Sequence, residues 1–315
     1  MIVVSQASGR RRDDAPADEA FAALARIPLF RGLTRAEIVV ARLGGLTNRN
    51  WRVTAPVGDF VLRLAGEGTN DLIDRAAEAH DARLAAEAGV GAEVVFADPA
   101  AGVLLCCFIA GAVTMTASDF GDPDMLRRAA RTLRRLHRSG VRFAATRDAF
   151  ATIDAYRALA EKRGRPLPAG LAAAIGEMAP LHRAFAAQAL PVAPCHWDPV
   201  AGNFLDTDER MYLVDYEFAA NGDPMWDLAY LALDAGFDAA CEGALLDAYF
   251  TGSPPADAAA RVVVYRALCD LVCCLWAVLD GSAAKPVDKR TADPEECLAR
   301  CRETVASARY RRHLG

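Results

Sequence analysis

The first third of the chain alternates apolar and polar residues in short runs that end at glycines. Runs of this kind cover 38–43, 50–56, 59–66, 93–97 and 102–109. A period of two residues with glycines at the turns is typical of antiparallel strands. Helical spacing of apolar residues covers 71–89 between the third and fourth runs, and a shorter amphipathic helix is expected over 18–30. These patterns predict a small β-rich lobe that contains one main helix.

The rest of the chain has mostly helical periodicity. Candidate helices cover 123–139, 147–163, 168–189, 223–236, 238–250, 255–280 and 293–312. Polar loops and two short strand-like runs interrupt them over 195–218. This order of elements predicts an α+β fold of two lobes, with a ligand site in the cleft between them. We expect a disordered leader over 1–17, an N-terminal lobe over 18–110 and a helical C-terminal lobe over 111–315.

Composition narrows the choice of partners. The chain has 315 residues, a net charge of -5 and 24% charged residues, which gives no reason to expect a nucleic-acid partner. Apolar runs such as 103–113 fall short of a membrane span, so no membrane partner is expected. We find no secretory signal and expect a cytoplasmic protein. The nine cysteines lack the spacing of a zinc site and are expected to be free thiols.

The stretch CHWDPVAGNFLDTDERMYLVDYEF, residues 195–218, carries the residues best suited to chemistry. Asp198 and Asn203 are five residues apart on a loop, and Asp215 follows at the end of an apolar run. A carboxylate such as Asp198 can orient an acceptor hydroxyl and take its proton. The Asn203 amide and the Asp215 carboxylate are oxygen ligands of the kind that magnesium prefers. Each of these residues alone is also a common turn residue, but their combined spacing favours a kinase.

Two segments of the chain, HWDPVAGNF and VDYEFAANGDPMWDLA, resemble the signature stretches of the choline/ethanolamine kinase and aminoglycoside phosphotransferase superfamily. The choline kinase branch is the most similar, and LGGLTNRNWRV resembles its nucleotide loop. The resemblance spans about residues 36–282. It implies a two-lobed protein-kinase-like fold, with ATP and Mg²⁺ as cofactors. It also implies that Asp198 is the catalytic base, whereas Asn203 and Asp215 bind magnesium.

A nucleotide site is expected in the N-terminal lobe. Lysine occurs only at positions 162, 285 and 289, so arginine must supply the positive charge there. Arg63 stands where a kinase fold places its phosphate-binding lysine, and Glu78 is its expected partner, with Asp81 and Glu87 as alternatives. The remaining candidates are the phosphate-loop residues Gly44, Gly45, Thr47 and Asn48 and the hinge residues Phe108, Ile109 and Ala110, which offer backbone groups to adenine.

The acceptor site is expected in the C-terminal lobe and to bind a small amino alcohol, choline or ethanolamine. Its candidate residues are Glu217, Tyr230, Asp234 and Trp276, and His196, Asp223 and Asp227 are expected to be structural. An aromatic cage binds a quaternary ammonium through cation–π attraction. Cys273 replaces the first of two family tryptophans, and WDP replaces the usual Asn-Asp-Leu. An aminoglycoside-type phosphotransferase and a catalytically silent nucleotide-binding protein therefore remain as alternatives.

Overall fold

The computed structural model describes residues 15–45, 48–66, 72–186, 190–280 and 293–307, and the chain divides into two compact units. The first unit comprises Met1–Thr116, Val141–Ala144 and Ala201–Ala219. The second comprises Ala117–Gly140, Ala145–Val200 and Ala220–Gly315. Residues 1–14 of the expected leader lie outside the described residues, and residues 15–17 belong to the first helix. The first unit also contains 201–219, which the sequence analysis placed in the C-terminal lobe.

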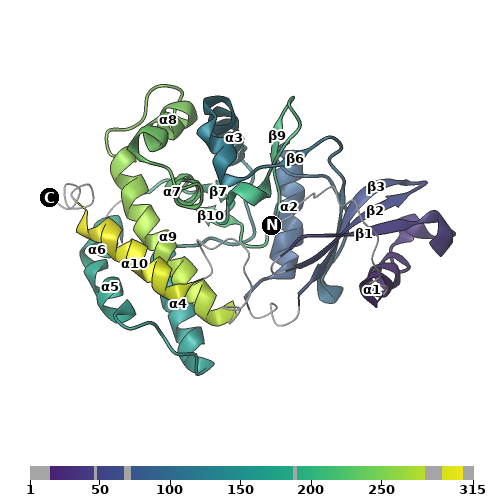
Figure 1. The fold of residues 1–315 in the computed structure, drawn as a ribbon, viewed down its shortest axis with the longest axis horizontal. Coiled ribbons are helices and arrows are strands. Elements are labelled where there is room, and N and C mark those ends of the chain that lie inside the picture. The colour runs from purple at the N-terminus through teal and green to yellow at the C-terminus, as the bar shows by residue number, and fades with distance from the viewer. Residues whose placement is uncertain (1–14, 46–47, 67–71, 187–189, 281–292, 308–315) are drawn as a thin grey trace. The chain divides into compact units, whose positions relative to one another are not determined.

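A five-stranded antiparallel sheet forms the centre of the first unit (Figure 1). Its strands, in spatial order, are β1 (Val39–Leu43), β2 (Asn48–Ala55), β3 (Gly58–Ala65), β5 (Val103–Cys107) and β4 (Val94–Asp98). The register places Arg63 of β3 between Asn50 of β2 and Leu104 of β5. The strands predicted from alternation are thus present, each within about two residues of its expected bounds.

The two faces of this sheet have different neighbours. Trp51, Leu62 and Leu105 share one face and pack against the helix α1 (Ala15–Leu24) and the short turn η1 (Pro28–Phe30). The turn η2 (Arg35–Glu37) precedes β1 and has no buried residue. Strand alternation turns Arg63 to the opposite face, where α2 (Arg75–Glu87) lies. The Asp74 carboxylate caps α2, because it accepts hydrogen bonds from the amides of residues 76 and 77.

A small three-stranded sheet completes the first unit. It pairs β6 (Val113–Thr114), β8 (Phe204–Asp206) and β9 (Met211–Leu213), and the turn η5 (Ala201–Asn203) precedes β8. A further turn, η3 (Pro99–Ala101), connects β4 to β5 in the larger sheet. The Leu213 amide donates to the Val90 carbonyl, which ties β9 to the segment after α2. The short segment that carries Asn203 and Asp215 is therefore built into the first unit.

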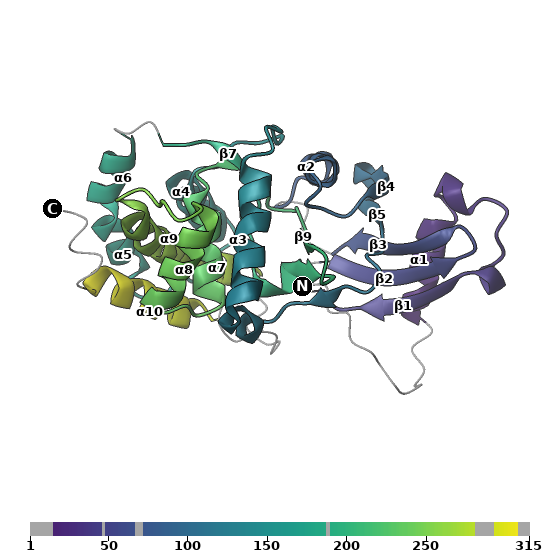
Figure 2. The ribbon, with the colours of Figure 1, turned by 90° about the horizontal axis from the view of Figure 1, so that it is seen from above.

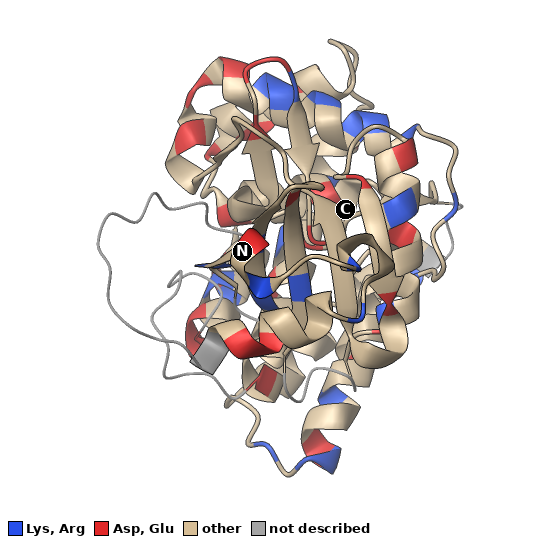
Figure 3. Ribbon diagram, turned by 90° about the vertical axis from the view of Figure 1, so that its right-hand side faces the viewer, with Lys and Arg blue, Asp and Glu red and all other residues tan. Residues whose placement is uncertain are grey.

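The second unit is helical (Figure 2). It contains η4 (Ala117–Gly121), α3 (Pro123–His137), α4 (Ala149–Lys162), α5 (Leu171–Glu177), α6 (Ala179–Ala186), α7 (Met225–Asp234), α8 (Ala239–Tyr249), α9 (Ala258–Asp280) and α10 (Pro294–Ala306). One pair of short strands, β7 (Ala193–Cys195) and β10 (Ala220–Gly222), lies among them. Acidic and basic residues are interspersed along the ribbon, as expected for a modest net charge (Figure 3).

Helix α9 is the central helix of the second unit and packs against α4, α7 and α10. It is long and apolar enough to cross a membrane, yet 78% of its most apolar window is buried inside the protein. The sequence analysis did not single out α9, because Arg261, Arg266 and Asp270 interrupt its apolar runs. Because its apolar surface is covered by other helices, the same composition fits a core helix.

One predicted helix is divided in two. The segment 168–189 forms α5 and α6, which meet at Met178. Pro180 is the second residue of α6, and proline has no amide hydrogen and crowds the preceding turn, so one continuous helix cannot pass through it.

Asp81 of α2 has a buried carboxylate that accepts the amide of Ala144 at 2.8 Å. Burial raises the pKa of Asp81 to about 6. The folded protein therefore holds this proton more tightly than the unfolded chain does. The stability that Asp81 contributes is complete below pH 4 and is lost as the pH rises through about 6.

We predict that Asp81→Asn flattens this part of the stability profile. The difference in unfolding free energy between the variant and the wild type should grow in the variant's favour between pH 4 and 7, by roughly 2 kcal/mol. Chemical denaturation across this range measures it. Asp81→Ala, which removes the acceptor for Ala144, should destabilise at every pH. Parallel profiles for Asp81→Asn and the wild type would contradict the prediction.

Candidate active site

Arg63 is the centre of a buried group of charges in the first unit. Its guanidinium pairs with Glu78 of α2 and with Asp215, which follows β9. The three side chains are 7%, 4% and 8% exposed, and charges buried to this degree are stable only with partners. Glu78 is thus the residue of α2 that pairs with Arg63, whereas Asp81 turns to Ala144.

Asn203 and Asp215 are joined through the backbone. The Val214 amide donates to the Asn203 carbonyl at 3.0 Å, and the Asn203 side chain is fully buried. Asp215 has a φ of 74°, in the left-handed region that few residues other than glycine, asparagine and aspartate adopt readily. A strained residue of this kind is held by its surroundings and is frequently found at a functional site.

The glycine pair at 44–45 lies in a tight connection between β1 and β2. The Asn50 side chain donates to the Gly44 carbonyl at 3.0 Å, and a side chain at Gly45 would collide with the Asn48 carbonyl. The close approach therefore requires glycine at position 45. Asn48 itself lies in β2 and donates to Glu217 at 2.7 Å, whereas Thr47 lies outside the described residues.

An apolar pocket lies beside Arg63. Val61, Leu104 and Cys106 line it from the sheet, and Phe108 and Ile109 line it from the chain after β5. Arg63 and Asp215 form its polar end, a combination suited to a flat base attached to phosphates. The Phe108 amide already donates to the Asp59 carbonyl, and Ala110 is not among the lining residues. Burial raises the pKa of Cys106 to about 12, so this thiol stays neutral.

Glu217 lies in the first unit with the nucleotide-site candidates. Its carboxylate accepts hydrogen bonds from Asn48 at 2.7 Å and from Arg75 at 3.2 Å. Oxygens of Glu78, Asp215 and Glu217 lie within 4.8 Å of one another, and a set of oxygen donors fits a hard divalent cation. Arg75 escaped the sequence analysis. The sequence feature that could have identified Arg75 is its position three residues before Glu78 on a helix, in a region without lysine.

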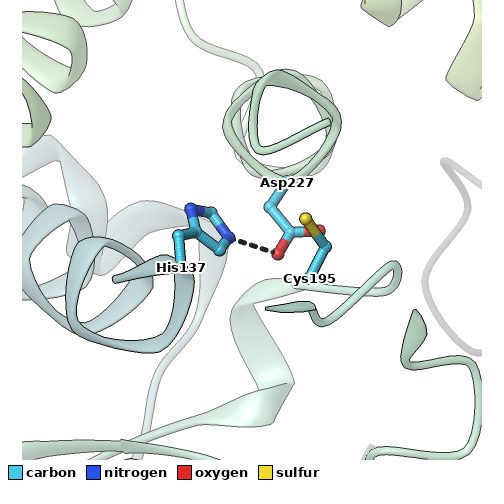
Figure 4. A group of neighbouring side chains, drawn as sticks. All are labelled: His137, Cys195 and Asp227. Atoms are coloured by element: carbon cyan, nitrogen blue, oxygen red, sulfur yellow. Dashed lines mark hydrogen bonds and ion pairs between the residues drawn. The ribbon is translucent and has the colours of Figure 1, made fainter. Parts of the chain in front are cut away.

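Asp227 of α7 holds the backbone of the loop that carries Asp198 in the second unit. Its carboxylate accepts the amides of His196 and Trp197 at 2.7 and 2.9 Å. Nε2 of His137 lies 2.9 Å from the same carboxylate (Figure 4). The His137 ring also contacts the Tyr249 hydroxyl at 2.8 Å. Asp227 thus has the bracing contacts expected of it.

Figure 4 also shows Cys195 beside Asp227 and His137. The Cys195 thiol donates to the carbonyls of Ala193 and Gly222 at 3.3 and 3.4 Å. Burial raises the pKa of this thiol well above its usual value. Each of the three side chains already has hydrogen-bond partners within the protein. We therefore interpret this group as structural.

Trp197 precedes Asp198 in an unusual conformation. Its φ is 69°, which is a strained value for a bulky residue. Its ring stacks on Trp226 at a centroid distance of 4.4 Å, and the Trp226 indole donates to the Trp197 carbonyl at 3.0 Å. The guanidinium of Arg147 lies 5.5 Å from the Trp197 ring. This packing explains how the loop accommodates tryptophan where asparagine is common among the kinases that it resembles.

The acceptor candidates Tyr230 and Trp276 have aromatic or sulfur neighbours in the second unit. The Tyr230 hydroxyl lies 3.3 Å from the Cys273 sulfur, and the Trp276 and Tyr156 rings are 6.3 Å apart. Burial raises the pKa of Tyr230 and Tyr156, and the charge of Asp198 raises both further. Tyr156 is therefore near the proposed base, although α4 gave no sequence signal for it.

Asp223 and Asp234 lie at opposite ends of α7. Asp223 accepts the Met225 amide at 3.0 Å and the Tyr265 hydroxyl at 2.8 Å, and it pairs with Arg261. These contacts fit a structural role for Asp223. Helix α7 begins at Met225, two residues after the start of the predicted helix, and Pro224 is its capping residue. Asp234 is the last residue of α7 and is buried.

The sequence profile of the phosphotransferase enzyme family matches residues 39–263. A choline/ethanolamine kinase family protein from Mesorhizobium loti has 41% sequence identity and a TM-score of 0.82, and the match covers 95% of this chain and 98% of that one. The choline kinase LicA of Streptococcus pneumoniae has a similar fold, with a TM-score of 0.77 at 24% identity, over 93% of this chain and 98% of that one.

Protein LicA of Haemophilus influenzae is 27% identical over 70% of this chain. The match spans 65% of that protein, just under two thirds of its length. The antiparallel sheet and the helical second unit match the kinase-like fold of these structural neighbours. The chain therefore belongs to the phosphotransferase enzyme family and, within it, to the choline/ethanolamine kinase family.

Proposed function

We propose that the protein is a kinase that transfers the terminal phosphoryl group of ATP to the hydroxyl of choline or of a related amino alcohol such as ethanolamine. The observation that carries the proposal is the buried contact of Arg63 with both Glu78 and Asp215, beside an apolar pocket. Similarity to the Mesorhizobium loti protein over nearly the whole chain supports the substrate class. A screen of purified protein with ATP, magnesium and candidate alcohols tests it.

The nucleotide fits the residues of the first unit. Val61, Leu104 and Cys106 supply aliphatic and sulfur surface for a base, and Arg63 supplies a guanidinium for phosphate oxygens. Asp215 and Asn203 would hold Mg²⁺, because both offer oxygen ligands. The bound ion supplies charge neutralisation of the phosphates. Glu78 keeps Arg63 oriented through a buried ion pair.

Asp198 is the proposed base of the second unit. Its role is to orient the acceptor hydroxyl and to take its proton as the oxygen becomes a nucleophile. Asp227 contributes by fixing the two amides that precede Asp198, at His196 and Trp197. A base held in this way needs little rearrangement before the reaction.

The acceptor is proposed to contact the aromatic residues of the second unit. Trp276 is half-buried, pairs with Tyr156, and can offer its face to an alkylammonium group. Cys273 is 3% exposed and contacts Tyr230, so the first tryptophan of the related kinases could not be added here without displacing Tyr230. The reduced aromatic surface makes ethanolamine as plausible an acceptor as choline on chemical grounds.

The first prediction concerns the base. Asp198→Asn should lower turnover by roughly 10²–10⁴, because it removes the proton acceptor and keeps the shape of the side chain. Nucleotide affinity, measured by calorimetry, should stay at the wild-type value. Asp154→Asn on the exposed surface of α4 is the matched control. A variant with more than a tenth of wild-type turnover would remove Asp198 from this role.

The second prediction concerns the nucleotide cation. Arg63→Ala should raise the KM for ATP by at least tenfold and change the KM for the acceptor much less. Of the two substrates, Arg63 is proposed to contact ATP, through its phosphates. Steady-state kinetics with each substrate varied in turn measures the difference. Arg26→Ala, on an exposed pair with Asp98, is the control. If only the acceptor KM moved, Arg63 would belong to the acceptor site.

The third prediction concerns the acceptor. Trp276→Ala should raise the KM for choline by up to about 30-fold, as expected for a loss of ~2 kcal/mol of cation–π attraction and packing. Ethanolamine, which can donate hydrogen bonds, should be affected less. Phosphorylation of kanamycin-type aminoglycosides, without turnover of choline or ethanolamine, would replace the proposed substrate class and leave the kinase assignment intact.

A further inference from the structure

Arg75 is a second buried arginine in the carboxylate group of the first unit. It is the first residue of α2, directly after the capping residue Asp74. Its Nη1 atom lies 2.9 Å from Glu78 and 3.2 Å from Glu217, and its side chain is 9% exposed. One guanidinium nitrogen therefore bridges the helix α2 and the segment after β9.

The charges explain why a second arginine is needed. Glu78, Asp215 and Glu217 bring three negative charges within 4.8 Å, and Arg63 pairs with the first two. If Arg63 turns to phosphate, as in the proposed function, Glu78 and Glu217 keep a cationic partner in Arg75. Glu217 also has a neutral partner in Asn48, which orients the carboxylate without cancelling its charge.

We propose that Arg75 is a positioning residue that serves as an internal counter-cation for Glu217 and Glu78. Because its guanidinium pairs with these carboxylates, Arg75 weakens their binding of a divalent ion when no nucleotide is present. The same positive charge favours the phosphates when nucleotide and metal arrive together. Arg75 thereby couples metal binding to nucleotide binding. This inference rests on the proposed nucleotide site and concerns a residue that the proposed reaction does not itself require.

A purely structural salt bridge makes a different prediction. Loss of a bridge that only holds α2 in place would disorder the carboxylates and weaken the binding of metal and nucleotide alike. Loss of a counter-cation leaves the same carboxylates more negative. It therefore strengthens the binding of a free metal ion and weakens that of a nucleotide. The opposite signs separate the two roles.

The experiment compares Arg75→Met with the wild type. Calorimetry with Mn²⁺ alone should give a dissociation constant at least threefold lower for the variant. Calorimetry with a non-hydrolysable ATP analogue and Mg²⁺ should give one at least tenfold higher, which corresponds to about 1.4 kcal/mol. Arg83→Met, on an exposed position of the same helix, is the matched control and should match the wild type in both assays.

A double-mutant cycle tests whether Arg75 acts through Glu217. We compare the fold-change in the Mn²⁺ dissociation constant that Arg75→Met causes in two backgrounds. In Glu217→Gln this fold-change should be at least three times smaller than in the wild type. Arg75→Lys, which keeps the charge, should retain most of the wild-type behaviour and serves if Arg75→Met does not fold. Weaker Mn²⁺ binding by Arg75→Met, or full additivity in the cycle, would overturn the inference.

The outcome for the wild type separates this inference from the proposed function. A wild-type protein that does not bind the nucleotide analogue with Mg²⁺ would contradict the proposed function itself. A wild type that binds it, with an Arg75→Met variant that behaves like Arg83→Met in both assays, would contradict only the role of Arg75.

Discussion

The buried charge of Arg63 is the constraint around which the first unit is arranged. A guanidinium on the interior face of a sheet needs anionic partners, and here they come from a helix and from a segment more than a hundred residues away, at Glu78 and Asp215. Removing either carboxylate would leave the other buried charges unbalanced. The position of α2, the end of β9 and the polar end of the pocket therefore depend on one another.

The second unit positions its proposed base by different means. Asp198 is half-buried, and the contacts that fix its loop are hydrogen bonds from backbone amides to Asp227. The Asp227 carboxylate accepts two successive amides and contacts the His137 ring. It therefore fixes both the position and the orientation of the backbone directly before Asp198. Buried ion pairs thus organise the proposed phosphate site in the first unit. Hydrogen bonds from backbone amides to a carboxylate organise the proposed base in the second unit.

Much of this arrangement was predictable, because local patterns encode it. The resemblance to the kinases singled out Arg63, and loop spacing singled out Asp198 and Asp215. The sequence could not reveal the contact between Arg75 and Glu217, because it joins segments 142 residues apart. Tyr156 was missed for the same reason, since helical periodicity does not tell which face of α4 meets α9. Tertiary packing decided each of these positions.

The stacking of Trp197 on Trp226 restricts which substitutions the chain can accept. A β-carbon at Gly222 would lie 2.9 Å from the Trp197 ring and 3.2 Å from the Arg147 carbonyl, so position 222 has no room for a side chain while tryptophan is present. Replacing Trp197 by a small residue would open that space and leave one face of Trp226 bare. Positions 197, 222 and 226 are therefore expected to vary together among relatives. A substitution at one of them would be accompanied by substitutions at the others.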